Sequence, residues 1–152
     1  MIEGMILHTI INYQKTIWEN KVDYSQLQPE NIISENQYEI SQDFINKYTE
    51  SVKDNSVYNN LVQPMAISAL SIRGVLNDLN IPGGTVHLNQ EFDYFSAVHK
   101  NEIINCKAKI ISNNVRAGWR FLVIKLETST KQQPIIMTGK STIMIPVEDE
   151  YD

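Results

Sequence analysis

The stretch that decides the fold is "PMAISALSIRGVLNDLNIPGGTVHLNQEFDYF", residues 64–95. Its first half is apolar at nearly every helical position up to Leu79, and Pro64 suits the first turn of a helix. A helix that is apolar on almost every side must be surrounded by other elements. The Pro-Gly-Gly sequence at 82–84 ends the helix, and the alternation after it predicts a strand with one buried face.

Four strands are expected after this break, because apolar and polar residues alternate with period two. In the first strand, the side chains of Val86, Leu88, Phe92 and Tyr94 are expected on one face. The connections are short, which favours antiparallel neighbours. The sequence therefore predicts an α+β fold, a buried helix packed on an antiparallel sheet. The expected strands are Thr85–Val98, Glu102–Ile111, Trp119–Thr128 and Ile135–Ile145.

The chain is expected to form one domain, since 152 residues that are 42% hydrophobic and 20% charged suffice for a single core. Ser41 is a good helix cap, and apolar residues recur after it at helical spacing, so an amphipathic helix is predicted there. Residues 1–37 are polar and broken in part, and we interpret them as an extension that packs on or flanks the domain. The domain is assigned to 38–147, and 148–152 is an acidic tail.

Charge and composition exclude several classes of function. The net charge of −5 argues against nucleic acid as a partner, because that affinity depends on Lys and Arg. Cys106 is the single cysteine, which fits a reducing, cytoplasmic setting. His8, His87 and His99 are scattered, so no metal site is expected. Polar residues interrupt the apolar N-terminus, and no membrane partner is expected.

Three segments in this order carry a resemblance: "YEISQDFINKYTESVKDNSVY" (38–58), "QPMAISAL" (63–70) and "IPGGTVHLNQEFDYFSAVHKNEI" (81–103). They resemble the MaoC-like hotdog proteins, which include (R)-specific enoyl-CoA hydratases, (3R)-hydroxyacyl-acyl-carrier-protein dehydratases and non-catalytic sister domains. The likeness to the family includes a Pro-Gly turn and a Gln-x-x-x-aromatic strand. It implies a hotdog fold, in which a curled antiparallel sheet wraps a long apolar helix.

Catalytic members of the family carry Asp-x-Asn-Pro-x-His after the first amphipathic helix, as the general acid and base of hydration or dehydration. The matching stretch keeps Asn55, but Lys53 stands at the Asp position and Tyr58 at the His position. Lysine and tyrosine have reference pKa values of about 10, so the resemblance implies that the usual dyad is missing. Asp54, one residue along, is either a lone base with a raised pKa or a turn former.

The resemblance also implies a thioester site at the N-terminus of the central helix, where backbone N–H groups polarise the carbonyl. Pro64 has no N–H to donate, whereas Met65 and Ala66 retain theirs. Small residues farther along this helix leave room for an acyl chain. The expected substrate-binding residues are Asn55, Met65, Ala66, Ser68 and Ala69.

Two further groups of residues each have two interpretations. His87 is either a packing residue, as in the non-catalytic sister domains, or a replacement for the dyad together with Asp54 or Glu91. The lysines on the strands either bind the phosphates of CoA or phosphopantetheine, or form a solvated face. Trp18 and Trp119 are expected to be packing residues. The lysines are Lys100, Lys107, Lys109 and Lys125.

The resemblance implies a protein that binds an acyl-CoA or acyl carrier protein thioester without a cofactor. It is expected to be a hydro-lyase of the hydratase or dehydratase type if active, and otherwise a non-catalytic subunit. The expected assembly is a homodimer, or a heterodimer with a catalytic MaoC-like chain, formed by joining sheets. A hotdog acyl-CoA thioesterase that uses Asp54 or Glu91, and a non-enzymatic partner or ligand-sensing subunit, remain alternatives.

Overall fold

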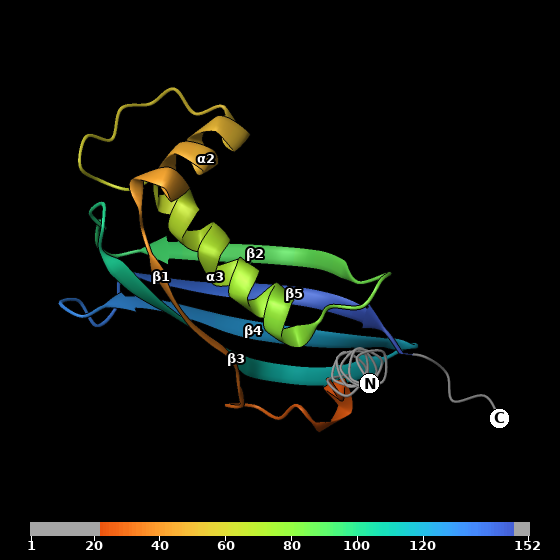
Figure 1. Ribbon diagram of the computed structural model, residues 1–152. Coiled ribbons are helices and arrows are strands. Elements are labelled where there is room, and N and C mark those ends of the chain that lie inside the picture. Colours follow the sequence, from red (N-terminus) through yellow and green to blue (C-terminus); the bar gives the residue numbers. More distant parts are fainter. Residues whose placement is uncertain (1–21, 148–152) are drawn as a thin grey trace, which may run out of the picture.

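The structure is a computed structural model that describes residues 22–147. A five-stranded antiparallel sheet, in the order β1-β3-β4-β5-β2, carries the helix α3 across one face (Figure 1). The second helix, α2, lies at the N-terminal end of α3. The elements are the short 3-10 helix η1 (Tyr24–Gln26), β1 (Ile32–Glu39), α2 (Gln42–Val52), α3 (Pro64–Leu79), β2 (Val86–Tyr94), β3 (Ile103–Arg116), β4 (Trp119–Thr130) and β5 (Met137–Pro146).

Both predicted helices are confirmed, with the expected start signals. The Ser41 hydroxyl accepts a hydrogen bond from the Phe44 N–H at 3.2 Å, which caps α2. Pro64 occupies the first turn of α3, where its missing N–H costs no helical hydrogen bond. Lys53 and Asn80 end the two helices in the left-handed conformation, with φ of 54° and 47°.

The core lies between α3 and the inner strands. The strands predicted at Glu102–Ile111 and Trp119–Thr128 are confirmed as β3 and β4, and alternate residues along both strands are buried. On its other side α3 approaches β1 at Gly74, where an added Cβ would lie 3.0 Å from Ser34 Oγ and Asn36 Nδ2. Gly74 therefore permits the close approach of helix and strand. The principal buried residues are Ala66, Ile67, Leu70, Leu79, Ile104, Ile110, Leu122, Ile124 and Leu126.

Strand β1 was not predicted from the sequence. It pairs with β3 at one edge of the sheet, and the expected boundary between residues 37 and 38 falls within it. Of its eight residues only Ser34 is buried. An edge strand with so little buried apolar surface has no clear hydrophobic alternation, and its polar composition was interpreted as an extension. The acidic tail 148–152 lies outside the described residues.

The prediction that Val86, Leu88, Phe92 and Tyr94 share one buried face of β2 is wrong. The pairing with β5 shifts between His87 and Asn89, so the alternation is broken at a bulge. His87 is opposite the buried Ile143 and points toward the α3 side, whereas Val86 and Leu88 are 41% and 48% exposed. Because β2 is the other edge strand, its burial pattern did not match a half-buried strand.

Candidate functional site

A cavity of about 360 Å³ opens at the N-terminal end of α3. Three parts of the chain meet there: the connection between α2 and α3, the first turn of α3, and the end of β2 with the segment that follows it. Figure 1 shows the connection curving over this end of α3. The walls are mainly apolar with two tyrosines, and include Tyr58, Leu61, Ile67, Tyr94, Phe95 and Ala97.

Tyr94 joins the end of β2 to α3. Its hydroxyl forms a hydrogen bond with Ser68 Oγ and a 3.2 Å contact with Met65 Sδ. Ser68 is 0% exposed, and its hydroxyl also contacts the Met137 sulfur at 3.3 Å. This buried polar chain fixes the Tyr94 ring in the wall of the cavity.

The loop after α2 turns around Asp54, as the turn interpretation expected. The Asp54 carboxylate accepts a hydrogen bond from the Ser56 N–H at 2.9 Å, and this bond is the main reason that the pKa of Asp54 lies below its ordinary value. The nearby Tyr58 and Gln63 side chains lower the pKa further. A lone base at neutral pH would need a raised pKa, so the lowered pKa of Asp54 favours the turn-former interpretation.

The N-terminus of α3 offers fewer donors than the sequence suggested. The Ala66 N–H donates to the Gln63 carbonyl oxygen at 3.0 Å, so it is not free to polarise a thioester. Gln63 is buried, and its Nε2 donates to Thr49 Oγ1 at 2.7 Å, which ties the helix start to α2. Within the described residues, the Met65 N–H makes no hydrogen bond to another group and is the remaining backbone donor at this turn.

The expected substrate-binding residues fall in different environments. Ala66 and Ser68 are buried in the core, and Met65 is 53% exposed. Asn55 and Ala69 are exposed, and none of the five expected residues is among those that line the cavity. The sequence analysis missed Tyr94 as a wall residue, although the Gln-x-x-x-aromatic pattern that ends at Tyr94 was the signal that marked it.

His87 lies at the opposite end of α3. It is seven residues before Tyr94 on β2, about 23 Å away at ~3.3 Å per residue, and its Nε2 is 3.2 Å from Ser141 Oγ. Glu91 pairs with Lys140 at 3.1 Å, and the hydrogen bond from Lys140 lowers the pKa of Glu91. No contact joins His87 to Asp54 among the described residues, and His87 lines the cavity at the C-terminal half of α3, so the structure offers no support for a dyad of these two residues within one chain.

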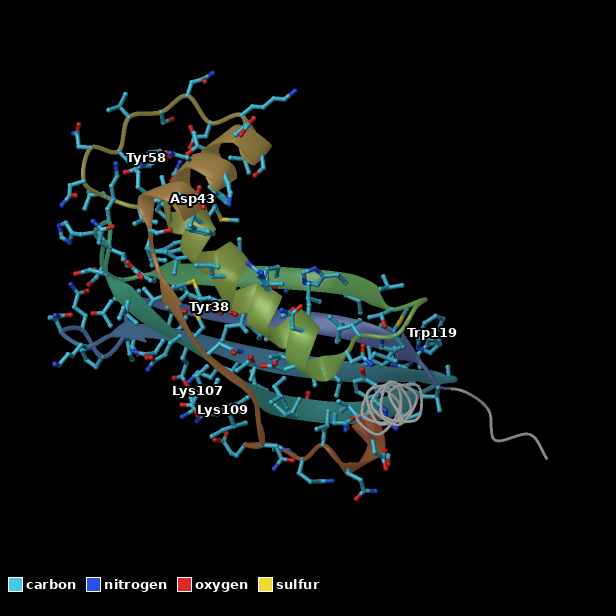
Figure 2. All side chains as sticks on the ribbon, viewed as in Figure 1. Tyr38, Asp43, Tyr58, Lys107, Lys109 and Trp119 are labelled. Carbon is cyan, nitrogen blue, oxygen red and sulfur yellow. The ribbon has the colours of Figure 1, made fainter. Side chains whose placement is uncertain are left out.

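The strand lysines support the solvated-face interpretation. Lys107 pairs with Glu35 and Lys109 with Glu30, both at 3.2 Å, and Figure 2 shows these lysines beside β1. Lys125 pairs with Glu127 at 2.9 Å. Exposed pairs of this kind contribute little to stability and leave no concentrated positive patch. Lys100 lies in the turn before β3, partly buried.

The remaining histidines and the tryptophans form no site in the described part of the chain. His99 contacts Glu102 at 3.8 Å, and residues 22–147 contain no cluster of three ligands that could hold a metal ion. Trp119 is half-buried at the start of β4, at the far end of the sheet in Figure 2. His8 and Trp18 lie outside the described residues. No helix in the described part of the chain is both long and apolar enough to cross a bilayer.

No family model and no curated protein matches this sequence. Among solved structures, a monoamine oxidase regulatory protein from Archaeoglobus is similar, with a TM-score of 0.71, 10% identity, and coverage of 84% of this chain and 95% of that one. An (R)-hydratase from A. caviae that is involved in PHA biosynthesis has a TM-score of 0.66 at 12% identity, with coverage of 80% and 98%.

The HadBC (3R)-hydroxyacyl-ACP dehydratase complex from Mycobacterium tuberculosis has a TM-score of 0.63 at 14% identity, with coverage of 82% of this chain and 98% of that one. The TM-scores and coverages show that the overall fold of the chain agrees with that of this group of structures. The described part of the chain therefore has the α+β hotdog fold of the (R)-hydratases and hydroxyacyl-ACP dehydratases.

Proposed function

We propose that this chain is a MaoC-like hotdog protein that binds an acyl thioester, of CoA or acyl carrier protein, at the N-terminal end of α3. The observation that carries the proposal is the cavity of about 360 Å³ at that end, the place where the resemblance puts the thioester. Its size lies in the usual range of small-molecule sites, about 300–1,000 Å³. Its apolar walls suit an acyl group, and the hydroxyls of the two tyrosines in its wall, Tyr58 and Tyr94, suit the thioester oxygen.

We infer further that the chain serves as a subunit of a hydratase or dehydratase system without supplying the usual acid and base. Lys53 and Tyr58 occupy the dyad positions, and Lys53 is the left-handed residue that ends α2. The neighbouring Asp54 is held ionised by the Ser56 N–H, with a lowered pKa that makes it a weak base. This supports a role in binding and shaping the substrate site.

The exposed edge of the sheet supports pairing with a second chain. Strand β2 is an edge of the sheet, and Val86, Leu88 and Phe95 on or next to it are exposed apolar residues. An uncovered edge of this kind is suited to pairing with the edge of another sheet. HadBC and ChsH1–ChsH2 from Mycobacterium tuberculosis, both similar in structure, are complexes. We propose a homodimer or a heterodimer with a dyad-bearing MaoC-like chain.

The test measures two reactions separately, hydration of crotonyl-CoA by its absorbance and release of thiol from acyl-CoA. The purified chain alone is expected to show neither reaction. Mixed with a dyad-bearing homologue, it is expected to form a complex that hydrates crotonyl-CoA faster than the homologue alone. Asp54→Asn in this chain should leave the rate of the mixture unchanged. Thiol release by the chain alone that Asp54→Asn abolishes would establish the thioesterase alternative instead.

A further inference from the structure

A second cavity, of about 350 Å³, lies between the C-terminal half of α3 and the sheet. It is separate from the proposed thioester site, because the two cavities share no lining residue and use different parts of α3: Pro64 and Ile67 for the thioester site, and Ile72, Val75 and Leu76 for this one. The 82–84 turn forms part of its rim. Its walls are aliphatic and come from three elements: Ile72, Val75 and Leu76 of α3, Ile124 and Leu126 of β4, and Ile143 of β5.

One polar pair stands in this aliphatic cavity. Ser141 is 8% exposed, and its Oγ is 3.2 Å from His87 Nε2. The bulge in β2 places His87 here by pairing it with Ile143, which points toward α3. No charged side chain is among the described residues of the lining. Besides this pair the lining holds the Thr85 hydroxyl, which already donates to the Pro82 carbonyl oxygen at 2.8 Å. The cavity therefore combines an apolar body with few polar groups, the usual composition of a small-molecule site.

The pair can present one donor to a ligand. When His87 Nε2–H donates to Ser141 Oγ, the serine proton is left to donate to an acceptor oxygen in the cavity. Apart from the His87 imidazole, the lining has no aromatic ring, and its branched aliphatic side chains suit a hydrocarbon chain. A chain that ends in a carboxyl group satisfies both features.

We propose that this cavity binds a medium-chain aliphatic carboxylic acid, with its chain against α3 and β4 and its carboxyl oxygen on the Ser141 hydroxyl, which His87 orients. The site is independent of the proposed thioester function. It would give the protein a position for a free acid at the end of α3 remote from the thioester cavity.

The test is calorimetric titration of the full chain with hexanoate, octanoate and decanoate. One acid per chain should bind, with affinity rising about fourfold per added CH₂ until the cavity is full. Leu76→Trp, at a half-exposed wall position, should weaken decanoate binding at least tenfold. Ser141→Ala should weaken it several fold and preserve the gain per CH₂. Ile111→Trp, exposed on β3 and outside the cavity, is the control and should bind as the wild type does.

Absence of decanoate binding by the wild-type chain would overturn the proposal, and so would equal affinity in the Leu76→Trp variant. Size-exclusion chromatography of Leu76→Trp identifies the other occupant. If the variant dissociates a dimer and the wild type binds no decanoate, a second copy of the chain covers the cavity. Binding of 1-decanol as tight as that of decanoate would overturn the assignment of the carboxyl group.

Discussion

Replacing Tyr94 with phenylalanine removes the hydroxyl that bonds Ser68 on the buried side of α3. Ser68 is 0% exposed, and afterwards its Oγ keeps only the Met137 sulfur at 3.3 Å, a weak acceptor. A buried hydroxyl without a strong partner costs about 1–3 kcal/mol, so Tyr94→Phe should lower the free energy of unfolding by about 1–2 kcal/mol. Ser68→Ala should cost less, because water reaches the 39% exposed Tyr94.

The double variant distinguishes this account from simple loss of packing. With both hydroxyls gone, no polar group is left stranded, and the total cost should stay below about 1 kcal/mol. Urea unfolding followed by circular dichroism measures it: at about 2 kcal/mol/M, Tyr94→Phe should lower the midpoint by ~0.5–1 M. Tyr48→Phe, whose hydroxyl bonds none of the described residues, is the control. Additive effects of the two single changes would refute the reasoning.

Three further changes test other parts of the fold. Ser41→Ala removes the cap on the Phe44 N–H and should lower the free energy of unfolding by about 1 kcal/mol, measured by urea unfolding; no change would exclude a capping role. Gly139→Ala places a Cβ 2.9 Å from the Phe92 ring and should cost about 1–3 kcal/mol and shift the β2 amide resonances. Burial raises the pKa of the Cys106 thiol from 9.0 to about 11. The contribution of the protonated thiol to stability is thus fully present below pH 9 and is lost as pH rises from 9 to 11. The free energy of unfolding should fall by about 2–3 kcal/mol over this range, and Cys106→Ala should remove that fall.

The elements that were predicted correctly from the sequence are those in which apolar residues repeat regularly. The apolar faces of α3, β3 and β4 repeat with the period of a helix or a strand, because each packs against a continuous core. The two edge strands were the failures. β1 buries only Ser34, and the bulge after His87 reverses the faces of β2, so neither follows a simple alternation.

The composition of the cavity at the start of α3 was not predicted from the sequence, since none of the five residues expected to bind substrate lines it. The resemblance placed the thioester site at the N-terminus of α3, where the cavity lies. Its walls come from segments far apart in the chain, such as Tyr58 and Tyr94, and a local pattern does not show that they meet. The sequence also did not show which way single side chains point or which backbone donors are free. Ala69 is exposed, and the Ala66 N–H already donates to the Gln63 carbonyl oxygen.

The most direct test of the central claim compares the binding of hexanoyl-CoA and free CoA by calorimetry. The account predicts that the acyl group raises the affinity at least about tenfold, since it buries apolar surface in the cavity at the start of α3. Ala97→Trp, an exposed wall residue, should abolish that difference, whereas Val115→Trp, on β3 outside the cavity, should preserve it. Equal affinity for hexanoyl-CoA and CoA, or an acyl preference that survives Ala97→Trp, would contradict the claim.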